Sequence, residues 1–149
     1  MRRPRLAARR RTSAQSTTDH TRSATIDDGP GTVEITSGTV PERDEPAALY
    51  GAVGWAAYIK DLDALSRSLR GSSRVVTARS DGRLVGVPRV ISDTVTIAYV
   101  QDIPVSPEEQ RGGVGRRLVT EALAPYATVR QKVLLTDDEP GQRAFVRFD

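Results

Sequence analysis

A glycine-rich run carries the strongest chemical signal in the sequence. It reads Gln110-Arg111-Gly112-Gly113-Val114-Gly115, follows a strand-like apolar segment and opens a helix-like one. Glycines let a backbone approach a ligand closely, and the unpaired N–H groups of a first helical turn attract anions. Arg116 and Arg117 add positive charge beside it. The run predicts a phosphate-binding turn, although an ordinary strand-to-helix turn needs the same small residues.

Several other kinds of chemistry are excluded or disfavoured by residue counts. The chain has no cysteine and one histidine, His20, which stands in a Ser/Thr-rich stretch. Disulfide scaffolds, thiol catalysis and cysteine-bound zinc are therefore excluded, and histidine-based catalysis is disfavoured. No Gly-Lys-Ser/Thr accompanies the glycines, and their spacing is not that of a dinucleotide fingerprint. We expect no metal site.

The segments that must position the glycine-rich run read as strands and helices in mixed order. Strand patterns cover residues 32–36, 74–79, 83–91, 95–105 and 130–136, and helix patterns cover residues 45–53 and 61–70. Another helix follows the glycines, with Val114, Leu118 and Ala122 on its apolar face. Asp81-Gly82 is a hairpin signal. This order predicts an α/β or α+β fold.

The first 30 residues differ in composition from the rest of the chain. They hold seven Arg and three Asp, a net charge of +4, whereas residues 31–149 hold 15 basic and 16 acidic side chains. We expect residues 1–30 to be a disordered Arg/Ser/Thr-rich tail and residues 31–149 to be one domain. A transit peptide, a phosphate-binding arm and an extension without function are all compatible with the tail.

The charge distribution and the apolar segments also bear on partners and location. Because the excess positive charge lies in the tail, a nucleic-acid partner is disfavoured. No apolar run is long enough to span a membrane, and the N-terminus lacks the apolar centre of a secretory signal. We therefore expect a soluble, cytoplasmic protein with no membrane partner.

The chain resembles the GNAT superfamily of acetyl-CoA-dependent N-acetyltransferases. Gln110-x-x-Gly113-x-Gly115 is similar to the family's Gln/Arg-x-x-Gly-x-Gly/Ala signature, in its expected place between a strand and a helix. The likeness is strongest over residues 50–145. Segments 75–78, 82–86 and 133–136 resemble family strands, and segment 142–145 resembles the start of the family's fourth helix. The resemblance implies a mixed, mostly antiparallel sheet flanked by helices.

This resemblance also implies an activity and a co-substrate. The protein would transfer an acetyl group from acetyl-CoA to a primary amine of a small molecule or protein. Backbone groups around Ile103 and Val105 would pair with the pantetheine arm, and the amides from Arg111 to Arg116 would hold the pyrophosphate.

Three further residues are candidates for contacts with the amine acceptor. Asp102 is the best-placed acid, as a base or an amine ligand, but an Asp that holds a backbone or Arg partner is an equally good reading. Trp55 and Tyr58 lie in the region that shapes the acceptor pocket in this family. Their spacing is also what a helix packing on a sheet requires.

The C-terminal residues depart from the family pattern. The family's fourth helix continues Ala-Phe-Tyr and leads into two more strands, whereas here Val146 takes the place of the Tyr. We therefore expect the last two strands to be missing and the 130–136 strand to be an exposed edge that favours a homodimer. Pro88 and Pro104 inside expected strands add irregularity. The alternative function is a catalytically impaired fold that binds acyl-CoA or a partner chain.

Overall fold

The fold is that of a computed structural model, which describes residues 23–26, 32–139 and 142–148. Its strands form one mixed sheet in the order β1-β2-β3-β5-β6-β7-β8, and β4 pairs with β3 beside that path. Neighbouring strands are antiparallel except β6 and β7, which are parallel. The strands are β1 (Ser23–Ile26), β2 (Val33–Ser37), β3 (Arg74–Ser80), β4 (Arg83–Gly86), β5 (Arg89–Ser92), β6 (Ile97–Gln101), β7 (Gln131–Glu139) and β8 (Gln142–Phe148).

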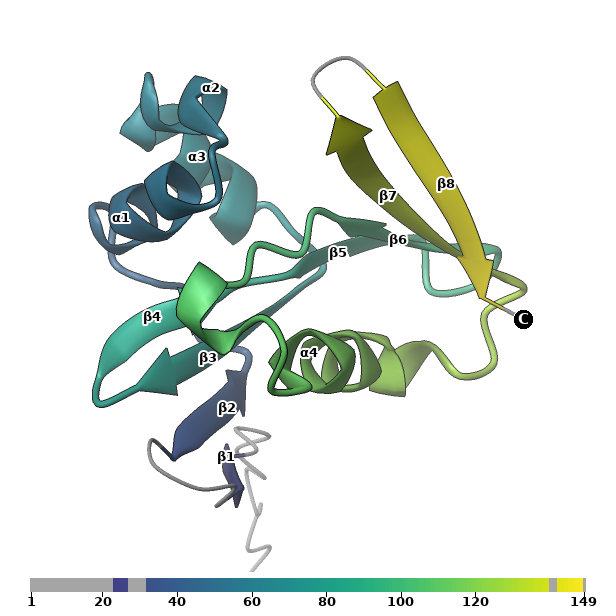
Figure 1. Ribbon diagram of the computed structural model, residues 1–149. Coiled ribbons are helices and arrows are strands. Elements are labelled where there is room, and N and C mark those ends of the chain that lie inside the picture. The colour runs from purple at the N-terminus through teal and green to yellow at the C-terminus, as the bar shows by residue number, and fades with distance from the viewer. Residues whose placement is uncertain (1–22, 27–31, 140–141, 149) are drawn as a thin grey trace, which may run out of the picture.

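Helices cover both faces of this sheet (Figure 1). Three of them, α1 (Glu45–Ala52), α2 (Ala56–Ile59) and α3 (Leu62–Arg70), gather on one face, and α4 (Val114–Leu123) lies on the other. Two short 3-10 turns, η1 (Pro107–Glu109) and η2 (Ala124–Tyr126), flank α4. The predicted mixed, mostly antiparallel sheet flanked by helices is confirmed. None of the helices in the described ranges has the length and apolar character needed to cross a membrane.

Each face of the sheet has its own hydrophobic core. Under α4, the fully buried Leu118 and Ala122 pack with Val76 and Val100 of the sheet. Under the other helices, Leu65 and Leu69 of α3 belong to a second cluster with residues of α1 and β4. The i, i+4 spacing of the buried residues in α3 and α4 explains why these segments form amphipathic helices. The two cores hold the sheet between the helices and fix its strand ends.

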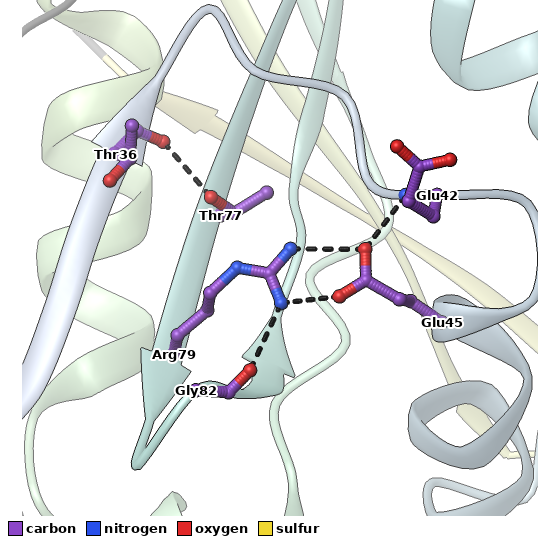
Figure 2. Close-up of polar contacts among 6 residues, drawn as sticks. All are labelled: Thr36, Glu42, Glu45, Thr77, Arg79 and Gly82. Atoms are coloured by element: carbon purple, nitrogen blue, oxygen red, sulfur yellow. Dashed lines mark hydrogen bonds and ion pairs between the residues drawn. The ribbon is translucent and has the colours of Figure 1, made fainter.

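Strands β3 and β4 form the predicted hairpin, and α1 is attached to it. Asp81 and Gly82 form the turn with positive φ angles of 49° and 78°, which Asp and Gly tolerate better than most residues. Figure 2 shows Arg79 of β3 reaching Glu45 at the start of α1 with two N–H groups, one of which also donates to the Gly82 carbonyl at 3.2 Å. The ion pair therefore joins the first helix to the sheet.

Two segments that we expected to be single strands are each divided. The 83–91 segment becomes β4 and β5 because Pro88 lies between them, where its missing N–H removes no ladder bond. The Pro88 carbonyl accepts from the Val76 N–H at 3.1 Å. The 95–105 segment ends its regular pairing at Gln101, before Asp102 adopts a φ of +57°. The two breaks, at Pro88 and at Asp102, lie next to each other in the sheet, because Arg89 pairs with Gln101.

Three expectations for the chain ends differ from the structure, the tail in part and the helix start at 142–145 and the exposed edge at 130–136 entirely. The expected disordered tail includes Ser23–Ile26, yet these residues form β1 and pair with β2. The rest of the 1–30 tail lies outside the described residues. Residues 142–148 form β8 and not the start of a helix, and β8 pairs along β7, so the 130–136 segment is not an exposed edge. Pairing satisfies the edge groups of β7, and Pro140-Gly141 in the sequence is a turn signal between the two strands.

Candidate functional site

Two parallel strands separate at the centre of the sheet. β6 and β7 pair from Ile97 with Gln131 as far as Gln101 with Leu135, and there the pairing ends although both chains continue. Asp102, in a left-handed conformation, turns the chain away from β7. The chain then pairs with β4 instead of β5, through a bridge between Gly86 and Val105. A gap in the hydrogen-bond ladder opens on the β7 side of residues 102–106.

The backbone that faces this gap has an unpaired donor. The Pro104 carbonyl accepts from Val87 N–H at 3.3 Å, and the Ser106 N–H donates to the Val85 carbonyl at 2.8 Å, so these groups face β4. Because backbone groups alternate along a strand, those of Ile103 and Val105 face the opposite way. The Val105 N–H has no hydrogen-bond partner within the described ranges. The Val105 carbonyl accepts from the Gln110 side-chain amide at 3.0 Å.

The glycine-rich run lies beside the same gap, at the start of α4. Gly113 is the N-cap residue with φ +79°, and no side chain caps the first turn of this helix. The N–H groups of that turn therefore keep their hydrogen-bonding capacity. A β-carbon on Gly115 would stand 3.7 Å from Val105 Cγ2, so the helix start lies against the strand end. The Gln110 side chain ties the turn to the strand.

A pocket of about 500 Å³ joins the strand end to the start of α4. We call it the Gly113 pocket. Its walls include six residues predicted for cofactor binding and one predicted for the acceptor; they are Ile103, Val105, Gln110, Gly113, Gly115, Arg116 and Trp55. Val53, Pro104 and Val119 also line it and were not singled out from the sequence. The structure thus brings most of the predicted site together.

Three residues predicted for cofactor binding lie beside this pocket and not in its wall. Arg111 and Gly112 are exposed in the turn before α4. The Val114 side chain is buried in the core under α4, so only its backbone N–H could face a ligand. The position of Val114 follows from the helix period, which turns the first side chain of α4 toward the sheet.

Asp102 is buried and bound to a tyrosine from the other face of the sheet. The residue is 4% exposed, and its carboxylate accepts a hydrogen bond from the Tyr58 hydroxyl. The Gln101 amide donates to the same hydroxyl at 3.4 Å. The sequence left two roles for Asp102, a base or amine ligand, or an Asp that holds a backbone or Arg partner. Neither role included the tyrosine partner that the structure shows. A contact across 44 residues leaves no signal in local spacing.

Trp55 and Tyr58 belong to an aromatic cluster with Tyr50. The ring centroids lie 5.9 Å apart for Tyr50 and Trp55, 5.1 Å for Tyr50 and Tyr58, and 6.2 Å for Trp55 and Tyr58. Trp55 both packs in this cluster and lines the Gly113 pocket. The packing role and the wall role therefore coexist in the same side chain.

The environment of the aromatic cluster keeps its hydroxyl groups protonated. Burial, followed by the hydrogen bond to Asp102 and its negative charge, raises the pKa of Tyr58 above the usual value for tyrosine. Burial and the charge of Asp102 likewise raise the pKa of Tyr50. Tyr58 therefore stays a hydrogen-bond donor to Asp102 throughout the physiological pH range. Among the described residues, no group of three Asp, Glu, His or Cys is arranged to hold a metal ion.

Comparison with known proteins identifies the family. Residues 43–145 match the profile of the acetyltransferase (GNAT) domain. Because this match covers more than half of the chain, the protein belongs to the GNAT acetyltransferases. The predicted family is confirmed.

Individual relatives agree with that assignment. A GNAT-family acetyltransferase from Streptococcus pneumoniae is similar with a TM-score of 0.62 and 29% identity, over 72% of this chain and 77% of that chain. A Gibberella zeae protein named as an acetyltransferase is 41% identical over 58 residues, which is 37% of this chain and a third (33%) of that relative. N-acetylglutamate synthase from Neisseria gonorrhoeae, solved with coenzyme A and N-acetyl-glutamate, shares the fold at 15% identity, with a TM-score of 0.54 over 70% of this chain and 26% of that chain.

Proposed function

We propose that the protein transfers an acetyl group from acetyl-CoA to a primary amine of a small molecule or protein. One observation carries this proposal: the end of pairing between β6 and β7 and the uncapped start of α4 open onto the same pocket. A ligand that has both a hydrogen-bonding arm and a pyrophosphate fits this combination. Family membership supports acetyl transfer in general.

The start of α4 suits the pyrophosphate. A helix N-terminus with free N–H groups and a positive dipole end binds anions, and Gly113 presents them without a side chain in the way. A β-carbon at Gly113 would meet nothing within 4 Å, so the space beside the turn is open. Arg116 lines the pocket and adds a positive charge. Arg111 and the amides of Gly112 and Val114 would complete this cradle.

The strand end suits the pantetheine arm. Its amides can extend a strand ladder, and the Val105 N–H faces the gap without a partner within the described ranges. Ile103 is the next residue whose backbone faces the same way. Apolar side chains of Trp55 and Val119 form further parts of the wall. The residues present therefore fit acetyl-CoA.

In this proposal Asp102 and Tyr58 would bind the amine and remove its proton. When bound, acetyl-CoA supplies a thioester carbonyl that a neutral amine can attack. An alkyl ammonium has a pKa of about 10.4 and must lose a proton first. Asp102 directly precedes Ile103 of the pocket wall, and its carboxylate can hold an ammonium or accept its proton through water. Tyr58 orients this carboxylate by its hydrogen bond.

Calorimetry of acetyl-CoA with the full chain tests the cofactor assignment. We expect Gly113→Asp to weaken acetyl-CoA binding by at least about tenfold, because its carboxylate would stand at the phosphate site and repel the ligand. Gly38→Asp is the matched control, since Gly38 also has a positive φ (+83°) and open space around it but lies outside the pocket. Equal binding by both variants, or no binding by folded wild type, would contradict the proposal.

The alternative, an impaired fold that binds acyl-CoA, is favoured by one feature of the C-terminal region. Val146 stands where the family has a tyrosine acid, and it lies in β8 instead of a helix. Both hypotheses expect acetyl-CoA binding, so turnover must separate them. A library of primary amines with a thiol-release assay gives that test: acetyl transfer to any amine supports the enzyme, and binding without transfer supports the impaired fold.

A further inference from the structure

A second pocket lies between the α2–α3 region and β5. It has a volume of about 250 Å³, and we call it the Arg89 pocket. Most of its wall is apolar and comes from the helices, including Ala64 and Leu65 of α3. Its polar members are Tyr58, Asp61, Ser68 and Arg89.

Among the described residues, the Arg89 guanidinium makes no hydrogen bond or ion pair, and its Nε is buried without a partner. Its positive charge acts on the neutral Tyr50 and Tyr58, whose pKa it lowers against the larger effect of burial. The arginines of the neighbouring strands differ in this respect. Arg74 pairs with Glu121 at 3.0 Å, Arg79 pairs with Glu45, and Arg83 pairs with Glu108. A partly buried cation without a partner is costly, so this position is explained best by a ligand that supplies the missing anion.

The other polar groups of the pocket do not supply a partner for the Arg89 guanidinium. Asp61 is exposed, and its Oδ1 caps α3 by accepting from the Ala64 N–H at 2.9 Å. The Ser68 hydroxyl donates to the Leu65 carbonyl at 2.7 Å. Of the described residues that line the pocket, Arg89 is therefore the one cation, and its Nε–H is the unsatisfied donor.

The pocket is adjacent to the proposed acceptor groups. Arg89 of β5 stands opposite Gln101 in the sheet register, one residue before Asp102. Tyr58 lines the Arg89 pocket, and its hydroxyl donates a hydrogen bond to Asp102. A molecule seated on Arg89 would thus lie beside Tyr58 and near the strand end that borders the Gly113 pocket.

We propose that the Arg89 pocket binds the carboxylate of the acceptor, so that the acceptor is an amine of the amino-acid class. This inference rests on the proposed function for the identity of the ligand as acceptor. Arg89 forms a charge-assisted, bidentate pair with the carboxylate, the apolar wall from α3 holds the body of the acceptor, and its amine lies toward Tyr58 and Asp102. The pocket thereby selects acceptors that carry a carboxylate over otherwise identical amines.

Equilibrium binding of matched ligand pairs to the full chain tests the inference without requiring turnover. The probes are L-alanine, L-leucine, L-phenylalanine and L-glutamate, each compared with its α-carboxamide by calorimetry in the presence of coenzyme A. We expect at least one amino acid to bind about tenfold or more tightly than its carboxamide. Arg89→Gln should remove that preference, and Arg89→Lys, which keeps the charge without the planar fork, should restore part of it.

Arg70→Gln is the matched control, because it removes one arginine charge from the exposed end of α3 outside the pocket. It should leave the preference unchanged, and thermal unfolding of all variants checks that they fold. Equal binding of every acid and carboxamide by folded wild type, or a preference that survives in Arg89→Gln, would overturn the inference. Failure of the cofactor assignment would appear separately, as loss of acetyl-CoA binding with the carboxylate preference intact.

Discussion

Asp102 shows how one residue can serve both structure and chemistry. Its positive φ ends the regular pairing of β6 and transfers the chain from β5 to β4. Aspartate tolerates the left-handed region better than most side chains, so the residue type that makes the turn also brings a carboxylate to it. The same turn leaves the Val105 N–H facing the gap beside β7. The geometry of the strand end therefore depends on the residue that we propose to handle the amine.

The hydroxyl of Tyr58 supplies a test at this scale. We expect Tyr58→Phe to lower kcat by about tenfold to a hundredfold, because Asp102 loses a hydrogen bond to a charged group worth about 1.5–3 kcal/mol. Acetyl-CoA affinity should stay unchanged, since Tyr58 is not in the wall of the Gly113 pocket. Steady-state kinetics and calorimetry measure the two quantities.

Tyr126→Phe is the control for that prediction. Tyr126 is also largely buried, and its hydroxyl has no hydrogen bond among the described residues, but it lies in η2 at the far end of α4. Its loss of a hydroxyl should leave kcat unchanged. An unaltered kcat in Tyr58→Phe, in an enzyme that turns over, would remove Tyr58 from the proposed site.

At the scale of elements, α4 packs closely against β4 at Gly86. A β-carbon on Gly86 would stand 2.5 Å from Leu118 Cδ1 and 3.4 Å from both the Ala78 β-carbon and the Pro104 carbonyl oxygen. Leu118 is fully buried and has little room to move. We expect Gly86→Ala to lower the free energy of unfolding by about 1–3 kcal/mol, as measured by urea denaturation.

The same substitution at Gly51 provides the comparison. Gly51 is exposed in α1, and a β-carbon there would be 3.9 Å from Ile59 Cδ1, an ordinary contact distance. Gly51→Ala should raise stability by up to about 1 kcal/mol through helix propensity. If Gly86→Ala were as stable as wild type, the close packing of α4 on β4 would be refuted.

The ion pair between α1 and β3 makes stability depend on pH. The hydrogen bonds from Arg79 lower the pKa of Glu45 below its usual value in the folded protein. Its stabilising effect is therefore complete above the unfolded pKa, near 4.5, and is lost as the pH falls through the lowered folded value. We expect Glu45→Gln to cost about 0.5–1.5 kcal/mol at pH 7, and we expect this difference from wild type to shrink as the pH falls below the unfolded pKa, measured by urea denaturation from pH 7 down to pH 3.

Glu42→Gln controls for the general effect of a lost negative charge. The Glu42 side chain is exposed, and it is the Glu42 backbone N–H that donates to Glu45, at 2.7 Å. This variant should follow the wild-type stability curve at every pH. A gap between wild type and Glu45→Gln that persists unchanged at pH 3 would show that the ionised carboxylate is not its source.

For the molecule as a whole, local patterns in the sequence predicted the elements better than their connections. The apolar period of Leu65 and Leu69, the Asp81-Gly82 turn and the glycine run before α4 were enough to predict those elements, because each depends on neighbouring residues. Six of the predicted cofactor residues consequently line one pocket. The β8 hairpin was not predicted, because residues 142–145 resemble the start of a family helix; the available local signal for the hairpin is Pro140-Gly141.

Contacts between distant segments account for the rest. The hydrogen bond from Tyr58 to Asp102 joins α2 to the end of β6. Arg89 lines a pocket only because α2 and α3 pack beside it. A single charge in the otherwise apolar run from Leu84 to Ile91 was the available signal for Arg89. Such a charge reads equally as a solvent-facing strand residue until the packing of the helices is known.

The position of Trp55 gives the molecule an intrinsic optical reporter. It is the only tryptophan of the chain, it lines the Gly113 pocket, and its ring centroid lies 6.2 Å from that of Tyr58, which lines the Arg89 pocket. Emission excited at long ultraviolet wavelengths therefore comes from a single fluorophore between the two pockets. Its emission therefore offers a direct test of ligand binding at the Gly113 pocket, with unlabelled ligands and unmodified protein.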